Sequence, residues 1–127
     1  MSDHGKFHWN ELMTRDVEGT KAFYAATVGW TFDDMPMPNG TYTIAKSGDD
    51  MAGGIFPMDE GDPKWEGVPE HWLPYLAVDD VDDCVAKAKS NGGSVMQEPF
   101  DVEGVGRIAI VRQPGGGVIG WMTPSQG

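Results

Sequence analysis

The hydrophobic pattern of the chain switches repeatedly between the two-residue period of strands and the longer period of helices. An aspartate in an N-cap position, Asp16 or Asp80, precedes each helical segment, and glycines end both. Three strand-like segments separated by turn residues follow each helix. The order strand, helix, strand, strand, strand therefore occurs twice. The predicted strands are 7–14, 30–34, 41–47 and 52–57, then 73–78, 94–98, 106–112 and 117–122, and the predicted helices are 17–28 and 81–91.

The two halves also match in sequence. At an offset of 64, residues 9–61 align with 73–125 without a gap, and eleven of the 53 positions are identical. Composition alone would give roughly three or four identities. We infer a single domain, residues 1–127, made of two copies of one unit. The units cover about residues 7–57 and 73–123, and the linker 58–72 is rich in proline, glycine and acidic residues.

Composition and charge limit the function classes. The chain has 127 residues with 9 basic and 20 acidic side chains, a formal charge of −11. This charge repels phosphate backbones, argues against nucleic-acid binding and favours cationic ligands. Apolar runs are too short to span a membrane, and residues 1–6 lack the basic and apolar features of a secretory signal. The single Cys84 excludes an internal disulfide. We expect a cytoplasmic protein without nucleic-acid or membrane partners.

Several short motifs carry a family resemblance. In the first half they are Thr14-Arg15-Asp16-Val17, Ala22-Phe23-Tyr24 and Gly29-Trp30, and in the second half Val78-Asp79-Asp80-Val81, Gly92-Gly93 and Gln113-Pro114-Gly115-Gly116. With the repeat, they make the chain similar to the vicinal oxygen chelate superfamily, which includes glyoxalase I, bleomycin-resistance proteins and extradiol dioxygenases. The resemblance implies an α+β fold of two tandem βαβββ units whose curled sheet surrounds a shared cavity. It also implies a homodimer.

The resemblance further implies four metal-ligand positions, filled in the metal enzymes of the family by His, Glu or Gln. The matching positions here are Trp9, the stretch 53–56, Leu73 and Gly120, and none of these carries a metal-binding side chain. We therefore expect neither a metal nor another cofactor. The alternative is a non-standard metal site formed by His8, Glu11 and His71. Strand alternation argues against it, because it places His8 on the face opposite to that of Trp9 and Glu11.

Alternation also predicts the side chains that line the cavity. One face of each unit's first strand would form an apolar floor for a small organic molecule, while Leu12, Leu76 and Val78 face the helices. The expected ligand-binding residues are Trp9, Glu11, Met13, Leu73, Tyr75 and Arg107. Ala77 lies on the same strand face as Leu73 and Tyr75.

Glu11 is the sharpest candidate because its carboxylate lies among apolar neighbours. It is a ligand-orienting acceptor or a general base, or else a structural acceptor held by Tyr75, Arg107 or a backbone amide. If Ala109 and Val111 line the cavity, Arg107 lies at its mouth, where it pairs with Glu11, grips an anionic ligand or is solvated.

Two further segments have simpler interpretations. The glycine-flanked stretch 98–106 is predicted to be a loop at the rim that closes on a ligand. Cys84 is predicted to be a small core residue.

Three functions remain open. The first is a metal-free protein that holds a small, aromatic or cationic ligand, as bleomycin-resistance proteins do. The second is an enzyme, either lactoylglutathione-lyase-like or dioxygenase-like with a non-standard metal site, or metal-free with Glu11 as general base. The third is an interaction module that docks a partner through Trp65 and Trp72 of the linker.

Overall fold

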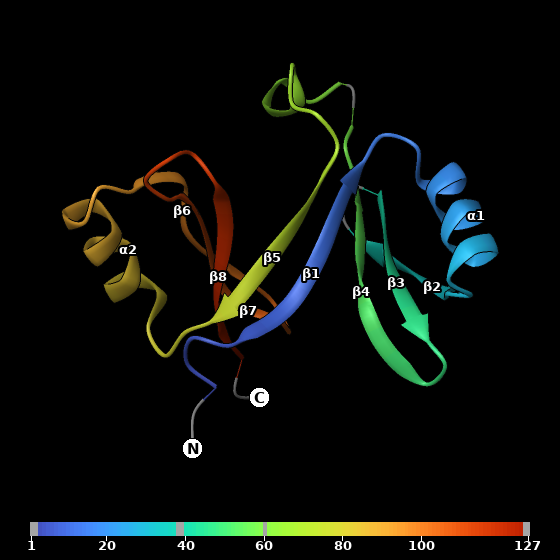
Figure 1. Ribbon diagram of the computed structural model, residues 1–127, viewed down its shortest axis with the longest axis horizontal. Helices are drawn as coiled ribbons and strands as arrows, with labels where there is room; N and C mark the ends of the chain where they lie inside the picture. The colour runs from blue at the N-terminus through green and yellow to red at the C-terminus, as the bar shows by residue number, and fades with distance from the viewer. Residues whose placement is uncertain (1–2, 38–39, 60, 126–127) are drawn as a thin grey trace. The chain divides into compact units, whose positions relative to one another are not determined.

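The computed structural model describes residues 3–37, 40–59 and 61–125 (Figure 1). Two compact units are distinguished, one formed by the described residues of 10–72 and the other by 3–9 with 73–125. Each contains one α-helix and four neighbouring strands. The α+β class, built from two βαβββ repeats, is the one that the sequence pattern predicts.

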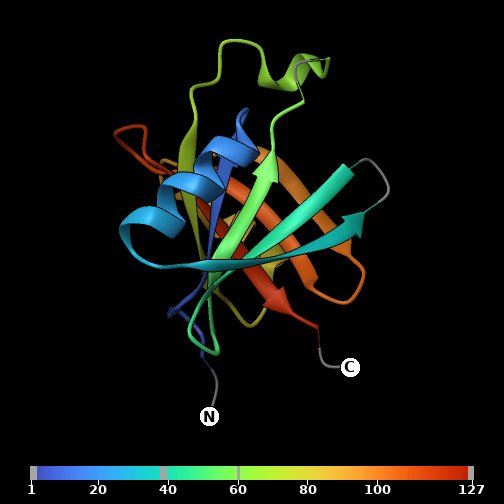
Figure 2. The ribbon, with the colours of Figure 1, turned by 90° about the vertical axis from the view of Figure 1, so that its right-hand side faces the viewer.

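The unit of residues 10–72 has the strand order β2-β3-β4-β1. The β1/β4 pair is parallel and the other pairs are antiparallel. Helix α1 contacts β4, and in Figure 2 it lies in front of its sheet. The elements are β1 (Phe7–Thr14), α1 (Val17–Thr27), β2 (Thr31–Met37), β3 (Gly40–Ser47), β4 (Asp50–Pro57) and the short 3-10 helix η1 (Pro63–Trp65).

The second unit repeats this plan with the order β5-β8-β7-β6, in which the β5/β8 pair is parallel. Helix α2 packs on this sheet through a core of five buried residues, Val78, Val81, Val85, Ala109 and Val111. The elements are β5 (His71–Ala77), α2 (Val81–Ser90), β6 (Ser94–Val102), β7 (Gly106–Arg112) and β8 (Val118–Pro124).

Both helices begin at the predicted aspartates. The Asp16 carboxylate accepts a 2.9 Å hydrogen bond from the amide of Gly19, and the Asp80 carboxylate accepts one of 3.2 Å from the amide of Asp83. Each cap satisfies an amide that has no partner inside its helix and contributes about 1 kcal/mol. The helix starts follow directly from the sequence.

The two helices differ in how deeply they pack. Helix α2 buries Val81 and Val85, whereas α1 has no fully buried residue. The apolar side chains of Phe23 and Val28 are 58% and 60% exposed. Val28 lies outside the packed face because it is the C-cap, one residue beyond the last turn. Helix α1 therefore leaves apolar surface open in its own unit.

The predicted rim loop over residues 98–106 is wrong. Strand β6 continues to Val102, with Phe100 opposite Ile108 and Val102 opposite Gly106. The ladder shifts register between Gln97 and Phe100, around a proline. Proline lacks an amide donor and is tolerated here because β6 is an edge strand with a bulge. Only the short connection before Gly106 turns.

The N-terminal segment joins the second unit. The amide of Gly5 donates to the carbonyl of Ala77 at 2.7 Å, and the amide of Ala77 donates to the carbonyl of Lys6 at 2.8 Å. The contact pattern consequently assigns residues 3–9 to the unit that contains 73–125, whereas the repeat alone would start the first unit near residue 7. Neither helix in the described part of the chain has the length and hydropathy needed to cross a bilayer.

Candidate functional site

The most specific polar contact on the sheet of residues 10–72 joins Glu11 of β1 to Tyr42 of β3. The Tyr42 hydroxyl donates a 2.8 Å hydrogen bond to Oε2 of Glu11, and both side chains are half-buried. Leu12, the next residue of β1, borders a hollow that is also lined by α1 residues. Because successive strand residues point to opposite faces, Glu11 lies on the face away from α1.

Gly54 of β4 makes room for this pair. It lies opposite Glu11 in the parallel β1/β4 ladder, so the two share a face. A Cβ on Gly54 would stand 1.7 Å from the Tyr42 hydroxyl oxygen and 2.3 Å from its ring carbon Cζ. The phenol therefore occupies the space over Gly54, which places its hydroxyl beside the carboxylate.

The second unit has a related arrangement. Tyr75 of β5 lies opposite Gly120 of β8, and a Cβ on Gly120 would come within 2.4 Å of the Tyr75 ring. The pairs Glu11/Gly54 and Tyr75/Gly120 are thus structural counterparts. Glu11 and Tyr75 are 64 residues apart in the sequence, whereas Gly54 and Gly120 are 66 apart. The offset between the two repeats therefore increases by two residues in the later strands. An even slip keeps every side chain on its face.

The other predicted ligand-binding residues, apart from Arg107, lie on β1 and β5. Met13 is 5% exposed, Leu73 2% and Tyr75 4%, and Ala77 is also buried. Trp9 is half-buried, and alternation puts it on the Glu11 face of β1. That these residues contact a ligand stays a prediction.

Arg107 has different partners from those predicted. Its guanidinium holds Asp82 of α2 through contacts of 2.7 and 3.1 Å and Asp101 of β6 through one of 3.1 Å. Arg107 lies on the same face of β7 as Ala109 and Val111, and that face packs against α2. The hydrogen bonds that Arg107 donates to Asp82 and Asp101 raise the pKa of its guanidinium. Its donors are engaged on the α2 side of its sheet.

The histidines do not form a metal centre with acidic groups in the described residues. No group of three or more His, Cys, Asp or Glu residues there is placed to hold a metal ion, so His8, Glu11 and His71 do not constitute one. His8 is exposed, and His71 has its Nδ1 2.8 Å from the carbonyl of Pro69. Gly54 and Gly120, at two of the four ligand positions, have no side chain to offer.

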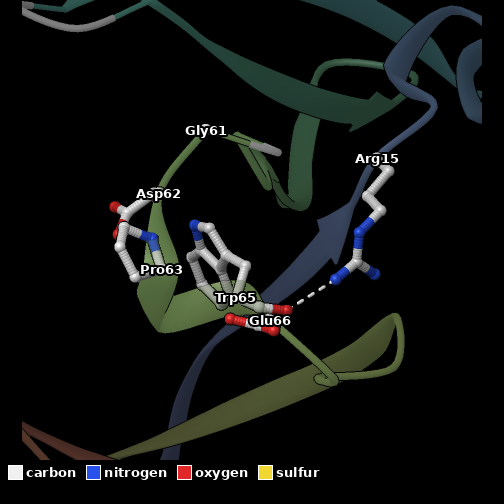
Figure 3. A pocket seen from close by; sticks show the side chains of 6 residues that line it. All are labelled: Arg15, Gly61, Asp62, Pro63, Trp65 and Glu66. Carbon is white, nitrogen blue, oxygen red and sulfur yellow. Dashed lines mark hydrogen bonds between the residues drawn. The ribbon is translucent and has the colours of Figure 1, made fainter.

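Two hollows open on the unit of residues 10–72, and Glu11 lines neither. The first, about 410 Å³, lies beside η1 and is lined by Arg15, Gly61, Asp62, Pro63, Trp65 and Glu66. Figure 3 shows the Arg15 guanidinium directed at the carbonyl of Trp65, to which it donates at 2.7 Å. The second, about 430 Å³, lies between Leu12 and the side chains of α1.

Cys84 packs beside the core under α2 and is partly buried. Burial raises the pKa of its thiol above the usual value, so the protonated form dominates at neutral pH. This is the structural role expected from its place in the helix, and it is unlike the environment of an activated nucleophile.

Sequence reasoning missed Tyr42. It proposed Tyr75, Arg107 or an amide as the partner of Glu11, and none of these is the donor in the Glu11–Tyr42 hydrogen bond. Tyr42 is 31 residues from Glu11 along the chain. The available signal was Gly54, a glycine inside a strand, which often marks the close approach of another group.

The fold, the repeat and the site geometry define a class of protein, and the comparisons agree with it. The model of the Glyoxalase/Bleomycin resistance protein/Dioxygenase superfamily matches residues 6–119, and the chain belongs to this superfamily. A solved structure of a hypothetical protein from Bacillus halodurans superposes with a TM-score of 0.72 at 13% identity, covering 97% of this chain and 96% of that one. This likeness shows the shared fold.

Two curated relatives are similar in sequence. "Putative glyoxylase CFP32" of Mycobacterium tuberculosis is 39% identical over 98% of this chain. Anthracycline biosynthesis protein DnrV of Streptomyces peucetius is 30% identical over 85% of it. The matches cover 46% and 43% of the relatives, so the chain spans about half the length of the curated relatives it matches.

Proposed function

We propose that this chain is a metal-free small-molecule-binding protein of the glyoxalase/bleomycin-resistance type. Glu11 and Tyr42 would orient a small, aromatic or cationic ligand against the sheet face that they share. The single observation that carries this proposal is their 2.8 Å hydrogen bond, which joins a carboxylate and a phenol on the sheet face away from α1. A few placed polar groups on an apolar surface are typical of small-molecule sites.

The neighbours of the pair support a binding role. Met13 follows on the same face of β1, and the glycine opposite Glu11 leaves room for the phenol. The Tyr42 ring provides an aromatic surface, while the carboxylate attracts a positive group or accepts a hydrogen bond. The formal charge of −11 favours cationic over anionic ligands through its long-range field.

A thermal-shift screen tests this function with planar cations, flavonoid-like aromatics and pyrimidines. A ligand that binds only the folded protein raises its Tm in a concentration-dependent manner. Glu11→Gln should weaken binding of a hit about tenfold, because a hydrogen bond to a charged group contributes about 1.5 kcal/mol or more. Tyr42→Phe should weaken it less.

The matched control is Glu66→Gln, which removes the same charge from an exposed position beside η1. It should bind the hit as the unmodified protein does. A hit whose affinity is unchanged by both Glu11→Gln and Tyr42→Phe would contradict the proposed site.

A second candidate function is metal-free acid–base catalysis. Glu11 would take a proton from a carbon next to a carbonyl, leaving an enolate, and the adjacent Tyr42 hydroxyl would donate a hydrogen bond to the developing oxyanion. The closeness of a carboxylate and a phenol favours this alternative. So does the name of the 39% identical relative, a putative glyoxylase.

Deuterium exchange separates the two functions. In D₂O, an enzyme of this kind would catalyse replacement of the α-hydrogen of its substrate by deuterium. NMR spectra of a panel of 2-oxo and 2-hydroxy acids, recorded with and without the protein, measure this exchange. Exchange should disappear in Glu11→Gln and slow in Tyr42→Phe. Binding without exchange in the unmodified protein would favour the first function.

The assembly proposed with this function is a homodimer. The superfamily resemblance is its source. Light scattering coupled to size-exclusion chromatography should give twice the chain mass of 13.8 kDa. A mass of one chain at micromolar concentration would contradict the dimer.

A further inference from the structure

The hollow on the α1 side of the sheet combines aromatic and acidic walls. Its lining includes Leu12, the aromatic rings of Phe23 and Tyr24, and the carboxylates of Asp16 and Glu70. Of the seven described residues that line this hollow of about 430 Å³, none is basic. We propose that it binds an organic cation, an ammonium or amidinium group carried on an apolar body, at a site separate from the Glu11–Tyr42 pair.

Glu70 is held in place by a buried hydroxyl. Thr14, which is 0% exposed, donates its hydroxyl hydrogen to Oε1 of Glu70 and accepts the amide hydrogen of Asp16 at 3.0 Å. The Thr20 hydroxyl lies 3.4 Å from that of Thr14. The hydrogen bond from Thr14 thus fixes one oxygen of the Glu70 carboxylate and keeps the negative charge beside the hollow.

The aromatic wall is fixed as well. Tyr24 stacks on Trp30 with ring centroids 4.7 Å apart, and its hydroxyl accepts a 3.3 Å hydrogen bond from the indole of Trp72. Phe23 meets the Tyr24 ring edge-on at 5.0 Å, yet it remains 58% exposed. A cation above such a ring face gains electrostatic attraction in addition to apolar contact.

The carboxylate of Asp16 lies where a side chain on Gly19 would begin. A Cβ on Gly19 would stand 2.2 Å from Oδ2 of Asp16, so a larger residue there would displace the carboxylate. Oδ1 already accepts the Gly19 amide as the helix cap. The capping role orients the carboxylate, and its charge adds to that of Glu70.

The nearby cations have other partners. Lys21 of α1 holds Asp34 at 3.2 Å and Glu18 at 3.6 Å, and Arg15 donates to the carbonyl of Trp65. Residues 10–72 carry 12 acidic and 4 basic side chains, so this unit contributes −8 of the formal −11. The field of the unit therefore favours a positive ligand.

The internal repeat provides a comparison within the same chain. At an offset of 64, Phe23 corresponds to Lys87, a solvated lysine that pairs with Asp83 at 2.9 Å. Thr14 corresponds to Val78, which belongs to the closed core beneath α2. At these two positions the α2 unit has a buried core valine and a solvated lysine, whereas the α1 unit has a hydroxyl that holds a carboxylate and an exposed phenyl ring. A held carboxylate beside an exposed aromatic ring is the combination that a site for an organic cation requires.

NMR titration with three probes of one skeleton tests the proposal: 2-phenylethylammonium, 2-phenylethanol and phenylacetate. The cation should shift the amide signals of Gly19, Thr20 and Phe23 and should bind more tightly than the other two. Glu70→Gln and Phe23→Lys should each weaken its binding at least about threefold. Higher salt should weaken it further.

The controls separate this site from the proposed function. Glu66→Gln removes an equal charge elsewhere in the unit and should leave the cation-induced shifts of Gly19, Thr20 and Phe23 unchanged. Binding of the cation at the Glu11–Tyr42 pair would shift amide signals of β1 and β3 instead, so the two sites are told apart by which signals move. Equal or tighter binding of phenylacetate or 2-phenylethanol would overturn the proposal. So would an absence of shifts with the cation, or unchanged affinity in both Glu70→Gln and Phe23→Lys.

Discussion

The phenol of Tyr42 fills the space that any side chain on Gly54 would need. A Cβ there would stand 1.7 Å from the Tyr42 hydroxyl oxygen, well inside contact distance. The glycine on β4 and the tyrosine on β3 therefore depend on each other, and together they set where the hydroxyl meets Glu11. This dependence can be measured without knowing the ligand.

Gly54→Ala should lower the free energy of unfolding by about 1–3 kcal/mol, because the methyl group forces the Tyr42 ring to move in a packed region. Urea unfolding measures the change. In a Tyr42→Ala background the space is already empty, so adding Gly54→Ala should cost much less. Equal costs in the two backgrounds would show that the ring does not occupy the space above Gly54.

Glu11→Gln and Tyr42→Phe should each reduce stability moderately, and their effects should not add. Tyr42→Phe removes the 2.8 Å hydrogen bond and Glu11→Gln removes the charge that strengthens it, so a double-mutant cycle should give a coupling of about 1 kcal/mol. Additive changes in the free energy of unfolding would indicate that the two groups do not interact in solution.

The Asp82–Arg107 pair should make part of the stability acid-sensitive. The hydrogen bond from Arg107 lowers the pKa of the Asp82 carboxyl below 3.8 in the folded protein. The resulting stabilisation is therefore present above about pH 3.8 and is lost as the pH falls through the folded-state value. Asp82→Asn should have a lower Tm than the unmodified protein at pH 6, and the gap should close towards pH 3. A gap that stays constant or widens on acidification would contradict this linkage.

Cys84 should react slowly. Because burial raises the pKa of its thiol, a disulfide reagent such as DTNB at pH 8 should modify the folded protein more slowly than it modifies the urea-unfolded chain. Equal rates in the two states would mean that the thiol is accessible and not perturbed.

Much of the fold follows from local features of the sequence. The capping aspartates Asp16 and Asp80, the terminating glycines and the matched spacing of the two halves act within a few residues of each helix, so they can be read without tertiary information. The end of β6 was missed because Pro99 indicates a loop, and only the β6/β7 ladder shows that the strand continues through a bulge.

The site was harder to predict because it depends on which face of each sheet the helix covers. Alternation correctly grouped Arg107 with Ala109 and Val111, but it gives no information about which face packs on α2. The Glu11–Tyr42 contact depends on the register of three strands, β1, β4 and β3, and no local pattern specifies that register. A glycine paired with a predicted site residue, as Gly54 is with Glu11, is the feature to seek in related sequences.

Native mass spectrometry of protein purified without a metal-affinity step tests the central claim most directly, since one spectrum reports both organic and metal occupants. The account predicts that a bound organic molecule adds its mass to the unmodified chain, that Glu11→Gln lacks this addition, and that neither carries a stoichiometric metal. One divalent ion per chain, retained by the unmodified protein and lost in Glu11→Gln, would contradict it.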